Sequence, residues 1–115
     1  MAISEFESKR AEAELEKFIA ARRPPVHLRS QVDLGYRISG QSVEIFEIRP
    51  RWDRPEIKIE IPVAKATYVK ARNLWKVFWR RQDLKWHGYQ PVPEVRRLED
   101  FLRLVGEDRH ACFFG

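Results

Sequence analysis

Aromatic and cationic side chains alternate almost without interruption between Leu74 and Tyr89, and these residue types can hold a polyanion. An indole or phenol ring can stack on a nucleic-acid base, and a lysine or arginine can neutralise a phosphate. The same residues could equally form an amphipathic strand that buries its rings and exposes its charges. The rings and cations of the segment are Trp75, Phe78, Trp79, Trp86 and Tyr89 with Lys76, Arg80, Arg81 and Lys85.

Two carboxylates around a predicted hairpin indicate a different chemistry. Asp33, followed by Glu47-Ile48-Arg49, resembles the Asp…Glu-x-Lys arrangement of a large nuclease superfamily. In that superfamily the carboxylates hold Mg²⁺, and the cation supports an attacking water. Arg49 replaces the lysine and cannot act as a base, and Pro50 stands where a helix is expected to follow. A Mg²⁺-dependent nuclease is therefore kept as the second alternative.

The histidines and the cysteine form no recognisable metal or nucleophile motif. His110 and Cys112 could lie on one side of a strand, but a zinc site normally needs more donors. The sequence has no Gly-x-x-x-x-Gly-Lys loop and no nucleophile beside a recognisable base. We expect no catalytic residue, no bound metal and no cofactor, so the sequence favours a non-enzymatic protein.

Length and composition indicate one folded domain over residues 1–115. The chain has 43% hydrophobic and 34% charged residues, which is typical of a globular protein. Its apolar runs are much shorter than the roughly 20 residues that cross a bilayer. Met1 is not followed by a basic and then apolar leader, and Cys112 is the single cysteine. We expect a cytoplasmic protein with no membrane partner.

The net charge of +5 is concentrated in the middle of the chain. Residues 1–23 carry five bases and five acids, and residues 92–115 carry four bases and five acids. Residues 24–91 carry thirteen bases and seven acids, a surplus of six positive charges. This surplus predicts an acidic partner for the central region, either nucleic acid or an acidic protein.

The N-terminal segment has the pattern of an amphipathic helix. Ser4-Glu5-Phe6-Glu7 has the form of a capping box, which satisfies backbone amides at a helix start. Pro24-Pro25 ends the helix, because proline lacks an amide donor and restricts the residue before it. The apolar residues at helical spacing are Ala11, Leu15, Phe18 and Ile19.

From Val32 onward, the pattern of the side chains repeats every two residues, as in a strand, and no longer at helical spacing. Residues 32–38 and 43–49 flank Ser39-Gly40-Gln41 and predict a hairpin. Glu47 lies on the same side of the second strand as Arg49, and we expect it in a partly buried ion pair with Arg49 or Lys65.

The segment after this hairpin predicts further antiparallel strands. Ile57, Ile59 and Ile61 alternate with charged residues, which predicts a strand with one buried face. Pro62 predicts a bend in that strand, because it cannot donate to the ladder. Residues 75–80 predict a later strand whose two faces differ. One face carries Trp75, Val77 and Trp79, and the other carries Lys76, Phe78 and Arg80.

A second helix and a short tail are expected at the C-terminal end. Pro93 suits the first turn of a helix and Gly106 suits its end. The apolar tail at 111–114 is expected to pack on the sheet. The order predicts an α+β fold, a four- to five-stranded antiparallel sheet flanked by an N-terminal and a C-terminal helix.

Four segments together carry a family resemblance: Val43-Glu44-Ile45-Phe46-Glu47-Ile48-Arg49-Pro50-Arg51-Trp52, and residues 62–68, 75–79 and 112–115. In these segments the chain resembles a family of short bacterial proteins classed as a domain of unknown function. The resemblance covers most of residues 30–115. It implies a bacterial origin and a stand-alone domain, and it implies no activity and no catalytic residue.

These observations favour a binding module with a basic, aromatic sheet face for nucleic acid or another polyanion. The first alternative is a protein-interaction module, for instance a homodimer formed through an apolar sheet edge or the aromatic tail. The residues predicted to bind are Arg49, Arg51, Trp52, Arg72, Lys76, Arg80, Arg81, Lys85, Trp86 and Tyr89, of which Trp52, Trp86 and Tyr89 are the rings expected to be exposed.

Overall fold

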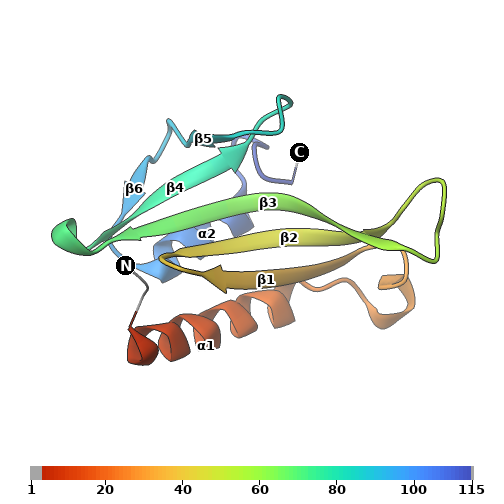
Figure 1. The fold of residues 1–115 in the computed structure, drawn as a ribbon, viewed down its shortest axis with the longest axis horizontal. Coiled ribbons are helices and arrows are strands. Elements are labelled where there is room, and N and C mark those ends of the chain that lie inside the picture. The colour runs from red at the N-terminus through yellow and green to blue at the C-terminus, as the bar shows by residue number, and fades with distance from the viewer. Residues whose placement is uncertain (1–3, 115) are drawn as a thin grey trace.

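The computed structural model describes residues 4–114 and shows an antiparallel sheet preceded by one helix and followed by another (Figure 1). This confirms the predicted α+β architecture. Strand order is β1-β2-β3-β4-β5, and β6 also pairs with β4. The elements are α1 (Glu5–Arg22), η1 (Val26–Leu28), β1 (Asp33–Ser39), β2 (Ser42–Pro50), β3 (Lys58–Val69), η2 (Lys70–Arg72), β4 (Leu74–Arg80), β5 (Trp86–Gly88), β6 (Glu94–Val95) and α2 (Leu98–Glu107).

Helix α1 begins and ends as its sequence predicts. The Ser4 hydroxyl accepts a hydrogen bond from the Glu7 amide at 3.2 Å, which satisfies one amide of the first turn. The helix ends at Arg22, two residues before the double proline. Its buried side chains are Ala11, Leu15 and Ile19. Within residues 4–114, neither helix is both long and apolar enough to cross a membrane.

A glycine lies in the turn between β1 and β2, and a proline lies at an irregularity in the pairing of β2 with β3. Gly40 has a φ of +61° in the turn between β1 and β2, a conformation that glycine adopts without strain. Between β2 and β3 the register shifts: Ile45 pairs with Ala64, and Phe46 pairs with Pro62. The extra residue is Val63, next to the proline that cannot donate to the ladder.

Both helices pack against one face of the sheet, and the core lies between them and the strands (Figure 1). The opposite face of the sheet is left open. The core combines residues of α1 and α2 with the inward residues of β2, β3 and β4, namely Ala11, Leu15, Val43, Ile45, Ala64, Ala66, Trp75, Val77, Leu98, Phe101, Leu102 and Val105.

Two sequence-based expectations about elements are wrong. Pro93 does not begin a helix: its carbonyl accepts from the Val77 amide, Glu94–Val95 pairs with β4 as β6, and α2 begins at Leu98. The isoleucine face of β3 is also not buried, since Ile59 and Ile61 are more than one-third exposed. This end of the β2–β3 hairpin extends beyond α1, at the right of Figure 1, so neither α1 nor α2 covers it, and only the segment around η1 lies beside its base, where Lys58 donates to the Ser30 carbonyl.

Candidate functional site

On the open face of the sheet, a lysine lies close to two aromatic rings that come from different strands. In the register of the sheet, Lys65 of β3 lies beside Phe78 of β4, and Arg80 of β4 lies beside Trp86 of β5. The Lys65 ammonium nitrogen is 5.0 Å from the centroid of the Phe78 ring and 5.0 Å from that of Trp86. Both distances fall within the range of cation–π attraction, so the ammonium is held over two half-buried rings.

Arg80 adds a second cation to the Trp86 ring. Its guanidinium carbon is 6.0 Å from the centroid of Trp86. The Nε atom of Arg80 is buried and has no hydrogen-bond partner among residues 4–114. A buried donor without an acceptor is unusual in a native protein. We call Lys65, Lys76, Phe78, Arg80 and Trp86 the open-face cluster.

The cations at this end of the sheet form no close ion pair in the part of the chain that the structure describes, although Glu44 is the cross-strand neighbour of Lys65 and Glu94 is that of Lys76. Within residues 4–114, none of the three cations of the cluster forms an ion pair, and neither do Arg81 and Lys85 of the β4–β5 turn. Asp83 in the same turn accepts from the Lys85 amide at 2.9 Å and lies 2.7 Å from Nε2 of His87. These two contacts, the amide first, lower the pKa of Asp83. The turn thus carries two cations, Arg81 and Lys85, against the one carboxylate of Asp83, and its net charge is positive.

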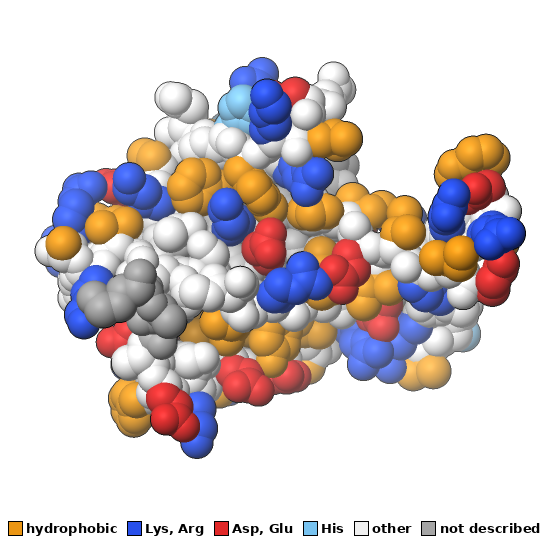
Figure 2. Space-filling model, in the orientation of Figure 1, with side chains coloured by type: hydrophobic (Ala, Val, Ile, Leu, Met, Phe, Trp, Pro, Cys, Tyr) orange, Lys and Arg blue, Asp and Glu red, His pale blue; other side chains and the backbone are white. Residues whose placement is uncertain are grey.

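In the other half of the open face, the arginine is paired with carboxylates. Arg37 of β1 pairs with Glu44 at 3.9 Å and also with Glu60, and its guanidinium carbon lies 4.9 Å from the centroid of the Phe46 ring. Figure 2 shows acidic and basic side chains interspersed with apolar ones over the strands. The cations of the open face that form no ion pair among the described residues thus lie on β4, the β4–β5 turn and the adjoining part of β3.

A model of one protein family matches residues 3–115, nearly the whole chain. The chain belongs to this family, a domain of unknown function (DUF3024). This confirms the resemblance to an uncharacterised domain family. No curated protein and no solved structure shows significant similarity to the chain.

Three of the predicted cations of this DUF3024 domain are already paired. Arg49 lies 3.2 Å from Glu47, so the expected ion pair of Glu47 forms with Arg49 and not with Lys65. Arg51 lies 2.6 Å from Asp53, and Arg72 lies 2.7 Å from Glu94. All three ion pairs lie outside the open-face cluster. The structure therefore does not bring Arg49 and Arg51 together with the unpaired cations, whereas Arg72 lies near Lys76, because its partner Glu94 is opposite Lys76.

The three rings expected to be exposed have three different environments. Trp86 is half-buried in the open-face cluster. Trp52 is 92% exposed, but it lies in the β2–β3 loop. Tyr89 is only 2% exposed, and its ring centroid is 4.8 Å from that of Phe113 in the tail. The expectation of an exposed Tyr89 is wrong, because the tail packs over it, and burial raises the pKa of its hydroxyl.

Two members of the open-face cluster were not among the predicted binding residues. Lys65 lies outside the aromatic segment, and Phe78 lies inside it but was not selected. The alternation of β4 predicted correctly that Phe78 shares a face with Lys76 and Arg80. The position of Lys65 depends on the pairing of β3 with β4, which no local pattern specifies.

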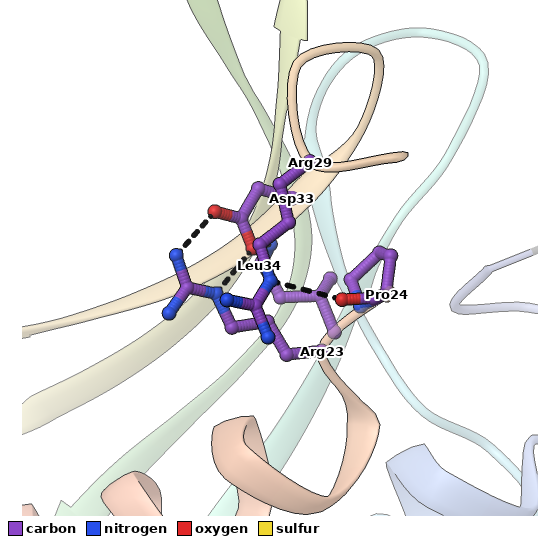
Figure 3. Close-up of polar contacts among 5 residues, drawn as sticks. All are labelled: Arg23, Pro24, Arg29, Asp33 and Leu34. Atoms are coloured by element: carbon purple, nitrogen blue, oxygen red, sulfur yellow. Dashed lines mark hydrogen bonds and ion pairs between the residues drawn. The ribbon is translucent and has the colours of Figure 1, made fainter. Parts of the chain in front are cut away.

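Asp33 and Glu47 do not form the metal site that the nuclease alternative requires. The Asp33 carboxylate accepts from Nε and Nη2 of Arg23 at 2.8 and 2.7 Å, and from the Leu34 amide at 2.8 Å (Figure 3). These contacts, the side-chain bonds to Arg23 first, lower the pKa of Asp33. Leu34 is the residue opposite Glu47, so Asp33 and Glu47 project to opposite faces of the sheet. Residues 4–114 contain no group of three acidic, histidine or cysteine side chains that could hold a metal.

Proposed function

We propose that this DUF3024 domain binds single-stranded nucleic acid on the open face of its sheet. The observation that supports this function is the placement of Lys65 between Phe78 and Trp86, with Arg80 beside them and no carboxylate paired to either cation within residues 4–114. Aromatic rings and unpaired cations on one accessible surface can stack on bases and attract the phosphates that join them.

A single strand fits this surface better than a duplex. Stacking on Phe78 or Trp86 requires a base whose flat face is free, and in a duplex both faces of each base are covered by its neighbours. The two rings lie on adjacent strands, which are separated by about 4.8 Å in a sheet. An extended strand with unpaired bases could therefore reach both rings from one side.

Lys65 must give up part of its ring contact when a base stacks. An exposed cation–π contact contributes about 0.5–1 kcal/mol, whereas stacking of one base on an aromatic side chain contributes about 1–3 kcal/mol. The exchange is favourable, and it is more so if the displaced ammonium then meets a phosphate. In this proposal the rings hold Lys65 in place until the ligand arrives.

The proposal is tested by titrating a fluorescent single-stranded oligonucleotide with the full chain. We expect binding at about 50 mM salt that weakens steeply by about 200 mM, as in other phosphate-dominated complexes. A double-stranded oligonucleotide and poly-glutamate serve as competitors. Preferential competition by the single strand supports stacking. Equal competition by poly-glutamate would instead indicate an acidic protein partner and contradict the role of the rings.

Charge reversal separates the proposed surface from the overall charge of the chain. Arg80→Glu with Arg81→Glu should abolish binding, because both positions lie at the positive end of the sheet. The matched control is Arg49→Glu with Arg51→Glu, which changes the net charge by the same amount at a distance from the cluster. Equal loss in the two double variants would show that only net charge matters. Circular dichroism checks that each variant is folded.

A further inference from the structure

The end of the β2–β3 hairpin exposes several large apolar side chains. We define the arm as residues 47–61, which include the end of β2, the connecting loop and the start of β3. Trp52 is 92% exposed, and Ile57, Ile59 and Ile61 are 36%, 39% and 38% exposed. Ile59 and Ile61 alternate along β3 and therefore point to one side of it, and Ile57 directly precedes the strand. Figure 2 shows apolar and charged side chains together on this projecting part of the molecule.

The isoleucines lie on the face of the sheet that the helices cover elsewhere. Ile61 is opposite Glu47 and Ile59 is opposite Arg49, on the face that continues from Ile45 in the core. Helix α1 ends at Arg22, and the arm extends past this end (Figure 1). The pattern of a half-buried strand is therefore present where neither α1 nor α2 reaches, and the isoleucines stay more than one-third exposed. Contiguous exposed apolar residues with charged neighbours are typical of a protein interface.

The charges of the arm match those of a second copy of the arm. Residues 47–61 carry four bases and four acids, so the arm is neutral in a chain whose net charge is +5. Two positively charged chains can approach each other there without net repulsion. Glu47 and Arg49 form an ion pair beside the isoleucine row. In a two-fold arrangement each copy would offer its arginine to the glutamate of the other, which is a self-complementary pattern.

We propose that two copies of this chain associate through the isoleucine faces of their arms, with Trp52 covered in the contact. This interface is separate from the open-face cluster and from the nucleic-acid binding proposed above. It also differs from the aromatic tail considered from the sequence, since Phe113 in that tail is buried within its own chain.

The exposed apolar area of the arm limits the strength of this dimer. A tryptophan side chain buries about 150–250 Å² when it is fully covered, and the partly exposed isoleucines add less. Two copies would therefore bury less than about 1,200 Å² in total, which is the range of weak interfaces. We expect a dissociation constant on the order of micromolar or higher.

Sedimentation velocity over a concentration series tests the proposal. The full chain is first treated with nuclease and kept at high salt, so that bound nucleic acid cannot link two copies. We expect a mass of 13.8 kDa at low concentration and a rise towards twice that mass as the concentration reaches about a hundred times the dissociation constant. Ile59→Lys and, separately, Trp52→Ser should keep the chain monomeric.

Leu84→Ser is the matched control, because Leu84 is 70% exposed in the β4–β5 turn, away from the arm. This variant should associate as the unmodified chain does. A chain that stays monomeric at millimolar concentration would overturn the proposal, and so would association that persists in both arm variants. Since the measurement is made without nucleic acid, neither result bears on the open-face cluster.

Discussion

Replacing Lys65 by methionine removes the cation between the two rings and keeps most of its apolar stem. The ammonium lies 5.0 Å from the centroids of both Phe78 and Trp86. Two exposed cation–π contacts of about 0.5–1 kcal/mol each give about 1–2 kcal/mol, and the methionine recovers part of this by packing on the rings. We therefore expect Lys65→Met to lower the free energy of unfolding by about 1 kcal/mol or less.

The same substitution should affect binding through the loss of one phosphate contact. For single strands, each contact contributes about 0.7 to the slope of log K against log salt, so the slope should become shallower by about 0.7. The loss of a contact of about 1 kcal/mol raises the dissociation constant about fivefold at low salt. Fluorescence anisotropy with a labelled oligonucleotide measures both quantities.

Arg49→Gln is the control for this prediction, because Arg49 is engaged by Glu47 at 3.2 Å and lies in the arm, outside the cluster. It removes one positive charge from the chain, as Lys65→Met does. We expect its salt slope to equal that of the unmodified protein. Equal slopes for Lys65→Met and the unmodified protein would refute the assignment of Lys65 as a phosphate contact.

Two further predictions concern stability. Gly35→Ala would place a Cβ atom 2.7 Å from Cε1 of Phe46, so we expect a loss of about 1–3 kcal/mol in urea unfolding, whereas Gly88→Ala meets no atom within 4 Å and should change stability little. Equal losses in both glycine variants would contradict this packing. Because its bonds to Arg23 lower the pKa of Asp33 below 3.8, the stability that the carboxylate contributes is complete at neutral pH and lost as the pH falls through the lowered pKa. Asp33→Asn should therefore be less stable than the unmodified protein at pH 7, and the difference should shrink as the pH falls through the lowered pKa of Asp33. A difference that stays constant throughout an acid titration would argue against this pairing.

Local sequence signals predicted the start and end of α1 and the faces of β4. Ser4 caps the helix because its hydroxyl is at the position required for an amide of the first turn. Phe78 shares a face with Lys76 because successive residues of a strand alternate. Each of these features depends on residues close together in the chain, which is why the sequence alone was sufficient.

The features that were mispredicted depend on distant parts of the chain. The alternation of Ile57, Ile59 and Ile61 predicts one apolar face, but only the reach of α1 determines whether that face is covered. Tyr89 is buried because Phe113 packs against it from the C-terminal tail. Lys65 joins Phe78 and Trp86 through strand pairing. Strand register and helix placement are tertiary properties, and they decided which predicted binding residues lie together.

Cross-linking of a single-stranded oligonucleotide to the protein tests the central claim most directly. Irradiation of the complex at low salt, followed by mass spectrometry of the peptides, identifies the rings that contact bases. We predict adducts at Trp86 and Phe78, and none at the exposed Trp52 of the arm. Adducts at Trp52 in their place, or no complex with a single strand even at low salt, would contradict the assignment of the open face as the binding surface.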